Sequence, residues 1–121
     1  FQFEVPSPEL KLNVDRTQIE QILINLLKNA REACSRKSDK KIQVKARKLS
    51  AGNTTLTISD NGEGILPDVL DKIFVPFFTT KTSGSGIGLS LCKQIMTLHE
   101  GSINVKSEVG KGSSFILTFP K

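Results

Sequence analysis

The longest periodic stretch of the chain has the spacing of a helix. From Ile19 onward, apolar residues recur three and four positions apart, as on one face of an α-helix. They are Ile19, Ile22, Leu23, Leu26, Leu27, Ala30 and Cys34. Asp15 stands where an N-cap residue belongs, and Gln18 occupies the capping-box position three residues later. The pattern predicts a helix that begins just after Asp15 and frays near residues 35–38.

Alternating apolar and polar residues predict the strands. The alternating stretches are residues 1–5, 10–14, 42–49, 55–59, 102–107 and 113–119. Pro67 opens a short helix over roughly 67–73, and a second amphipathic helix over 87–99 is ended by Gly101. Residues 74–86 show no period and carry Pro, Thr, Ser and Gly, which predicts a long loop. Helices interspersed with hairpins indicate a mixed sheet with helices packed on one face.

Length and composition describe a single ordinary domain. The 121 residues are 37% hydrophobic and 24% charged, and no apolar run approaches the roughly 20 residues of a membrane helix. Because the sequence begins abruptly at Phe1 without a signal-peptide pattern, we expect a cytoplasmic domain of a longer chain. Cys34 and Cys92 lie on predicted helix faces among apolar neighbours, so we expect reduced core thiols.

The chain carries a net charge of +5, from seventeen basic and twelve acidic residues. Much of the excess falls in one stretch, at Arg36, Lys37, Lys40, Lys41, Lys45, Arg47 and Lys48. A basic stretch invites a nucleic-acid interpretation, but no nucleic-acid-binding motif accompanies it. We expect a solvated surface and no direct nucleic-acid partner.

Two asparagines in the long predicted helix need an explanation. Asn25 and Asn29 are four residues apart, so they lie side by side at the edge of the apolar stripe. Asparagine is a poor residue inside a helix, because its amide competes with the backbone for hydrogen bonds. The amide oxygens suit a hard cation such as Mg²⁺. The alternative is that both amides hydrogen-bond a neighbouring loop.

An acidic residue followed by glycines comes directly after a β-branched strand. Asp60 is followed by Gly62 and Gly64, which permit close approach of a flat ligand to the backbone. The carboxylate can accept a hydrogen bond from an exocyclic amine. An ordinary Asp-Asn-Gly turn is the alternative interpretation.

The long loop combines aromatic residues, hydroxyls and glycines. Phe74, Phe77 and Phe78 should pack onto the domain or close over a ligand, unless they are a simple hydrophobic anchor. Thr79, Thr80 and Lys81 suit phosphate oxygens, and the glycine-rich residues 84–88 run into a helix start, which favours anions. Neither a dinucleotide fingerprint nor a P-loop matches. With the acid and the asparagines, these features indicate a Mg–ATP site with a flexible lid.

In this order the segments resemble the boxes of the catalytic ATP-binding (HATPase_c, Bergerat-fold) domain of two-component sensor histidine kinases, a superfamily shared with gyrase, Hsp90 and MutL. The matching stretches are residues 21–30 (N box), 60–65 (first glycine box), 74–78 (F box), 84–89 (second glycine box), and 99–101, 110–115 and 119–120 (C-terminal pattern). The resemblance covers essentially the whole chain. It implies an α+β fold: a two-layer α/β sandwich with a mixed, mostly antiparallel sheet and about three helices on one face.

The resemblance also implies roles for individual residues. Asn29 would hold Mg²⁺, Asp60 would accept the adenine amine, and Phe74 and Phe77 would belong to the lid anchor. The residues implied to bind the nucleotide are Asn25, Lys28, Asn29, Asp60, Gly62, Gly64, Ile65, Phe74, Phe77, Thr79, Thr80, Lys81, Gly84, Gly86, Ile87, Gly88, Leu89 and Ser113.

Some positions depart from the family pattern. Ser113 stands where relatives usually have threonine near the adenine, and a hydroxyl is kept. Glu32 replaces the basic residue that many relatives carry three positions after the metal-binding asparagine, so Lys28 or Lys81 would supply that charge. Asn25 replaces the glutamate base of the gyrase-type ATPases. It cannot take a proton from water, so we expect slow hydrolysis.

The implied function of residues 1–121 is that of a protein-histidine kinase catalytic domain. It would bind ATP and Mg²⁺ and donate the γ-phosphoryl group to a histidine on a dimerisation domain of the same protein, for onward transfer to a response regulator. We expect the isolated domain to be monomeric, with any membrane attachment through segments preceding Phe1. The alternatives are a serine-directed anti-sigma-factor kinase, which should lack the F box, and a non-catalytic nucleotide-binding module.

The only histidine of the chain, His99, resembles an acceptor because Glu100 follows it. The context is wrong, however, because Gly101 and a strand follow at once, whereas the acceptor motif continues along a helix. We therefore expect a helix-to-strand connection here, and no phosphorylation of the isolated chain on its own histidine.

Overall fold

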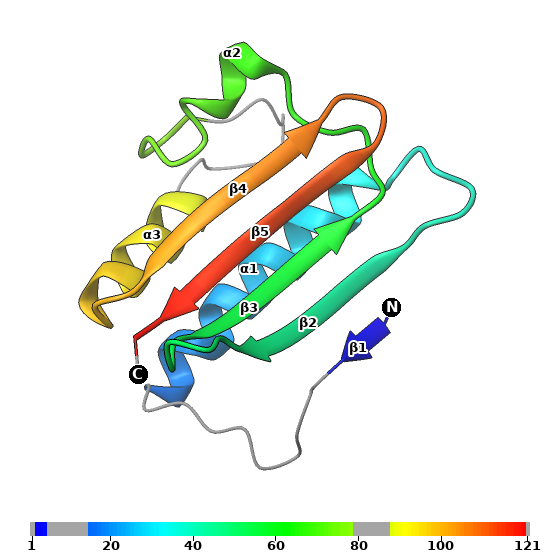
Figure 1. The fold of residues 1–121 in the computed structure, drawn as a ribbon. Coiled ribbons are helices and arrows are strands. Elements are labelled where there is room, and N and C mark those ends of the chain that lie inside the picture. The colour runs from blue at the N-terminus through cyan, green and yellow to red at the C-terminus, as the bar shows by residue number, and fades with distance from the viewer. Residues whose placement is uncertain (1, 5–14, 79–87, 121) are drawn as a thin grey trace.

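The computed structural model of the chain describes residues 2–4, 15–78 and 88–120. Its elements, in chain order, are β1 (Gln2–Glu4), α1 (Arg16–Ala33), β2 (Ile42–Lys48), β3 (Thr54–Asp60), α2 (Pro67–Leu70), α3 (Gly88–Leu98), β4 (Ser102–Glu108) and β5 (Gly112–Phe119) (Figure 1). These elements confirm the predicted helices and strands, although α2 is shorter than predicted. The strand predicted over 10–14 and the loop residues 79–87 lie outside the described residues.

The five strands form one mixed sheet in the order β1-β2-β3-β5-β4. β1 pairs in parallel with β2, and every other neighbouring pair is antiparallel. The helices α1 and α3 lie across one face of this sheet (Figure 1). The predicted two-layer α+β architecture is therefore confirmed. β5, the last strand in the chain, lies between β3 and β4, and its register places Ser113 opposite Asp60.

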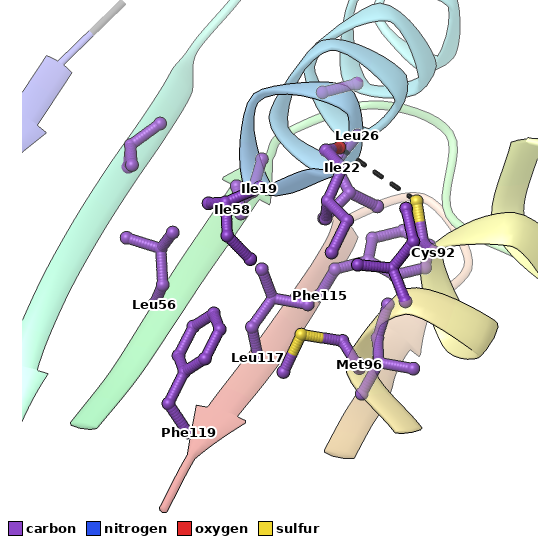
Figure 2. Close-up of a cluster of buried hydrophobic side chains, with 14 of the residues drawn as sticks. Ile19, Ile22, Leu26, Leu56, Ile58, Cys92, Met96, Phe115, Leu117 and Phe119 are labelled. Atoms are coloured by element: carbon purple, nitrogen blue, oxygen red, sulfur yellow. Dashed lines mark hydrogen bonds between the residues drawn. The ribbon is translucent and has the colours of Figure 1, made fainter. Parts of the chain in front are cut away.

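The core lies between the sheet and the two long helices, as both periodicities predict. Its buried side chains are Ile19, Ile22, Leu26 and Ala30 of α1, Cys92, Ile95 and Met96 of α3, and Val44, Leu56, Ile58, Ile103, Phe115, Leu117 and Phe119 of the sheet, together with Ile73 (Figure 2). No helix within the described residues is long and apolar enough to cross a membrane.

Both cysteines are free thiols buried in the structure, as predicted. The Cys92 thiol lies 4.0 Å from the carbonyl oxygen of Ile22, across the interface between α3 and α1 (Figure 2). Burial is the main reason that the pKa of Cys92 rises to about 11, so the thiol stays protonated at neutral pH. Cys92 is therefore a packing residue rather than a nucleophile.

The end of α3 differs from the prediction. The backbone N–H of Gly101 donates to the Met96 carbonyl and that of Glu100 to the Thr97 carbonyl, which is the Schellman pattern. The sequence predicted that Gly101 ends the helix, but the left-handed position after the helix is taken by Glu100, with φ of 59°. Gly101 is required for another reason, because a Cβ there would collide with the Thr118 carbonyl oxygen.

The start of α1 is tied to this same end of α3. Asp15 caps the helix as predicted, and its carboxylate accepts the Gln18 N–H at 3.0 Å. In a capping box the Gln18 side chain would bind the backbone N–H of Asp15. Instead, that N–H donates to Nε2 of His99 at 3.0 Å, and Nδ1 of His99 lies 2.9 Å from the Ile95 carbonyl oxygen. A carbonyl only accepts, so the ring must be the neutral tautomer with its hydrogen on Nδ1.

This geometry predicts which residue stabilises the start of α1. His99→Ala should lower the free energy of unfolding by about 1 kcal/mol, because the Asp15 N–H loses its acceptor. Gln18→Ala should change it far less, since Gln18 does not bind that N–H. Urea denaturation of both variants measures the difference. A large loss for Gln18→Ala with none for His99→Ala would restore the capping-box interpretation.

Candidate functional site

One edge of α1 connects the start of α3 with the loop that follows β3. Asn25, Asn29 and Ala33 succeed one another at intervals of four residues, so they share this edge over about 12 Å. At one end, Nδ2 of Asn25 donates to the carbonyl of Gly88, the first residue of α3, at 3.3 Å. At the other end, the Ala33 carbonyl accepts the Glu63 N–H at 3.2 Å. Asn29 lies between these two contacts.

The Asn25 amide is used by the protein itself. Besides its bond to Gly88, its oxygen accepts a hydrogen bond from the Gln21 side chain at 3.2 Å. These contacts are of the kind that the alternative interpretation expected, although they go to the start of α3 and to α1 itself rather than to a loop. Asn29 is half-buried one turn further along, and its amide oxygen is of the type that Mg²⁺ prefers. Within the described residues, no group of three or more His, Cys, Asp or Glu side chains offers another metal site.

The carboxylate of Asp60 is held by the backbone at the end of β3. It accepts the Gly62 N–H at 2.8 Å and also the N–H of Ser113, its partner across the sheet. Burial raises the pKa of Asp60 above its ordinary value of 3.8, and the two N–H donors partly offset this by favouring the ionised form. The result is a half-buried acceptor with a fixed direction.

The glycines after Asp60 have a structural reason of their own. A Cβ on Gly62 would lie 2.5 Å from the Ala33 carbonyl oxygen. Gly64 has φ of 78°, and a Cβ there would collide with the Glu108 carbonyl oxygen. In the sequence, these glycines predict close approach of a ligand. In the structure, the space that a side chain would take is occupied by the end of α1 and by the end of β4.

Asn61 is a site residue that the sequence analysis missed. Its Oδ1 accepts the Lys41 N–H at 2.8 Å and lies 3.5 Å from the Cys34 thiol, which donates to it. Its Nδ2 donates to the Asp39 carbonyl at 2.7 Å. One side chain thus fixes the residue after Asp60 to the segment between α1 and β2. The only signal in the sequence is the Asp-Asn-Gly order, which equally describes an ordinary turn.

Ser107 is the second residue that the sequence analysis missed. Its hydroxyl oxygen accepts the Ile65 N–H at 2.8 Å and lies 3.1 Å from the Gly112 carbonyl and 2.8 Å from the Ser113 hydroxyl. Ile65 and Ser113, both predicted nucleotide-binding residues, are therefore joined through Ser107. In sequence, Ser107 is one more polar position of an alternating strand.

The F-box segment is only partly packed. Phe74 is half-buried against the core, and the Lys93 ammonium lies 5.6 Å from its ring centroid, within cation–π range. Phe77 is 77% exposed and adopts φ of 67°, an uncommon backbone conformation for a bulky residue. Of the two expected alternatives, packing onto the domain is confirmed for Phe74, whereas Phe77 does not pack onto the domain. That Phe77 closes over a ligand stays a prediction.

The structure describes only some of the remaining predicted site residues. Lys28 is exposed on α1, and Leu89 is partly buried against the core at the start of α3. Thr79, Thr80, Lys81, Gly84, Gly86 and Ile87 lie outside the described residues.

This fold is the one seen in the catalytic domains of histidine kinases. The family model described as "Histidine kinase-, DNA gyrase B-, and HSP90-like ATPase" matches residues 14–121. The chain therefore belongs to this family, and its relatives are sensor histidine kinases.

Two relatives and one solved structure illustrate the similarity. AtoS of Escherichia coli, a signal transduction histidine-protein kinase, is 42% identical over 109 residues, which are 90% of this chain and 18% of AtoS. The sensor histidine kinase ZraS of Salmonella typhimurium is 39% identical over 110 residues, 91% of this chain and 23% of ZraS. The chain thus spans about a fifth of these relatives. The catalytic domain of histidine kinase ThkA has a TM-score of 0.86 at 36% identity, covering 99% of this chain and 78% of that one.

Two further solved structures contain binding partners. Full-length ShkA in complex with AMPPNP has a TM-score of 0.84 at 27% identity, covering 98% of this chain and 25% of ShkA. ThkA in complex with the response regulator TrrA has a TM-score of 0.78 at 32% identity, covering 99% of this chain and 33% of ThkA.

Proposed function

We propose that residues 1–121 form a domain that binds Mg–ATP and donates the γ-phosphoryl group to a histidine on the dimerisation domain of the same sensor kinase, for onward transfer to a response regulator. The single observation that carries the proposal is the layout of the α1 edge. It runs from the loop after Asp60, past Asn29, to the start of α3. Along this edge, the proposed acceptor for the amine, the proposed metal ligand and a helix N-terminus follow one another. This is the order of the base, the metal and the phosphates in bound Mg–ATP.

At the base end, Asp60 would accept the exocyclic amine of adenine. Its carboxylate is already fixed by Gly62 and Ser113, so little ordering is needed when the nucleotide binds. A carbonyl in place of the amine would face an acceptor and be rejected. The proposed ligand is therefore an adenine nucleotide.

At the phosphate end, Asn29 would contribute an oxygen to Mg²⁺, and the N-terminus of α3 would face the phosphates. When bound, Mg²⁺ neutralises charge on the phosphate oxygens. Asn25 keeps α3 in place through its bond to the Gly88 carbonyl. Two asparagines one turn apart on α1 would thus have different tasks, Asn25 in positioning α3 and Asn29 in binding the metal.

The chemistry proposed is a direct displacement at phosphorus. A nitrogen of the acceptor imidazole forms a bond to the γ-phosphorus as the bond from that phosphorus to the bridging oxygen breaks, leaving ADP. The Asn25 side chain cannot act as a base toward water. This supports transfer of the phosphoryl group to a histidine rather than hydrolysis of ATP. The complexes of ShkA with AMPPNP and of ThkA with a response regulator support nucleotide and regulator as partners of this chain too.

His99 is not the proposed acceptor. Both of its ring nitrogens are occupied, by the Asp15 N–H and by the Ile95 carbonyl. A nucleophilic nitrogen needs a free lone pair, and the lone pair on Nε2 already accepts the Asp15 N–H. These contacts support an acceptor outside residues 1–121 and a reaction between two domains.

The test mixes the purified domain with radiolabelled ATP, Mg²⁺ and a separately produced dimerisation domain from its parent kinase. We expect acid-labile phosphate on the dimerisation domain and none on the 121-residue chain. A dimerisation domain whose acceptor histidine is replaced by glutamine is the control. ATP binding without any transfer to the intact acceptor would favour a non-catalytic nucleotide-binding module. Transfer to serine would favour a serine-directed kinase.

A further inference from the structure

We propose that Ser107 is a positioning residue that turns the hydroxyl hydrogen of Ser113 away from the nucleotide, so that Ser113 and Asp60 together offer only acceptors and select a base by its exocyclic amine. This inference rests on the proposed function and adds a specificity device to the same site. It concerns three side chains on three neighbouring strands, Asp60 of β3, Ser113 of β5 and Ser107 of β4, all within the described residues.

The hydroxyl of Ser107 has three polar neighbours. The Ile65 N–H is 2.8 Å from its oxygen, the Gly112 carbonyl oxygen is at 3.1 Å, and the Ser113 hydroxyl oxygen is at 2.8 Å. A serine hydroxyl has one hydrogen to donate and two lone pairs to accept with. Three neighbours therefore use its full capacity.

Only one assignment of hydrogens satisfies all three contacts. The Ile65 N–H can only donate, so it takes one lone pair of Ser107. The Gly112 carbonyl can only accept, so it takes the single hydrogen of Ser107. The Ser113 hydroxyl must then donate to the remaining lone pair of Ser107.

With its hydrogen committed to Ser107, the Ser113 hydroxyl presents lone pairs alone. Ser113 stands directly opposite Asp60 in the β3–β5 register, so their side chains lie on the same face of the sheet. The Ser113 N–H also binds the Asp60 carboxylate. An ionised carboxylate only accepts hydrogen bonds. The base end of the proposed site therefore carries two neighbouring acceptors, the side chains of Asp60 and Ser113, and neither of them donates to the base.

Two neighbouring acceptors distinguish an amine from a carbonyl. An exocyclic amine has two hydrogens to donate, whereas a carbonyl has none and would face lone pairs on both sides. Removing the Ser107 hydroxyl would release the Ser113 hydrogen, which could then turn and donate to a carbonyl. The hydroxyl of Ser107 would thus affect the choice of base rather than binding strength alone.

The test compares ATP with inosine triphosphate, whose base carries a carbonyl in place of the exocyclic amine and a hydrogen on the adjacent ring nitrogen. Dissociation constants of both, with Mg²⁺, are measured by calorimetry on the intact 121-residue chain. In Ser107→Ala, the preference for ATP over inosine triphosphate should fall by about fivefold, the value of roughly one hydrogen bond. Ser107→Thr keeps the hydroxyl and should restore the preference.

The sheet supplies a matched control. Ser59 and Ser114 form another cross-strand hydroxyl pair, also 2.8 Å apart, one residue away along each strand and therefore on the opposite face. Ser114→Ala removes a hydrogen bond of the same kind without touching Asp60 or Ser113, so the preference for ATP should not change.

Each outcome decides between the explanations. Equal weakening of both nucleotides in Ser107→Ala, with the preference intact, would overturn the proposal and leave Ser107 a structural residue. If Ser107→Ala does not fold, Ser113→Ala removes the second acceptor directly, and an unchanged preference there would overturn it as well. A wild-type chain that binds neither nucleotide would instead refute the proposed function.

Discussion

Asp60→Asn should weaken ATP binding by about 10- to 150-fold, the value of a charge-assisted hydrogen bond of about 1.5–3 kcal/mol. The substitution keeps the shape of the side chain and removes its charge, so the exocyclic amine loses its strongest acceptor. GTP should bind the wild type much more weakly than ATP, because a carbonyl would face the carboxylate. Calorimetry with both nucleotides measures the effect. Equal affinity of the wild type for ATP and GTP would contradict the assignment of Asp60.

The stability of Asp60→Asn, unlike its affinity for ATP, should stay the same or increase. Burial raises the pKa of Asp60 in the folded chain, so the folded state favours the protonated form. For an acid shifted upward, stability is greatest below the unfolded pKa and is lost as pH rises through the folded pKa. At neutral pH the ionised Asp60 therefore costs stability, and Asp60→Asn should unfold at the same or a higher urea concentration. A variant that loses both ATP and stability would show that Asp60 is structural.

Asn29→Ala should remove most of the Mg²⁺ dependence of ATP binding. Loss of a group that merely orients a metal ligand typically costs 10- to 100-fold in metal affinity, so loss of a direct ligand should cost at least about tenfold. ATP affinity measured with Mg²⁺ and with a chelator gives the dependence. We expect the two values to converge in the variant and to differ in the wild type.

Asn25→Ala is the matched control, since it removes the same side chain from the same edge of α1. Its amide donates to the Gly88 carbonyl, so the expected loss is about 1 kcal/mol of stability with the Mg²⁺ dependence retained. If Asn25→Ala loses the metal dependence and Asn29→Ala keeps it, the two roles are exchanged. Asn25→Glu, which restores the gyrase-type base, would also place a carboxylate against the Gly88 carbonyl and loosen the start of α3.

The elements of the fold could be predicted because each depends on a local pattern. The apolar stripe from Ile19 to Ala30 has one interpretation, and the alternation in β5 has one buried face. Asp60 and Asn29 could be singled out because a charged strand end and a mid-helix asparagine break those patterns. Residues that depart from a local rule are visible in sequence even before their partners are known.

The remaining site residues depend on contacts between distant parts of the chain. Ser107 binds Ile65 from 42 residues away, and His99 binds Asp15 from 84 residues away. Neither serine in an alternating strand nor histidine at a helix end breaks a local rule, so nothing in their own segments distinguishes them. The exposure of Phe77 could not be predicted for the opposite reason. Burial is the default for an aromatic residue, and the left-handed turn that exposes Phe77 has no signature in the residue type.

The central position of β5 has a consequence for how the domain folds. Thr54 pairs with Phe119 and Asp60 with Ser113, so the middle of the sheet closes over more than fifty residues of chain. Pairings between such distant segments slow folding, because the entropy of loop closure is lost before the contacts form. The same pairings bring Asp60 its second N–H donor. During synthesis from the N-terminus, nucleotide would therefore not stabilise the nascent chain until β5 has emerged. ATP would stabilise only domains whose sheet is already complete.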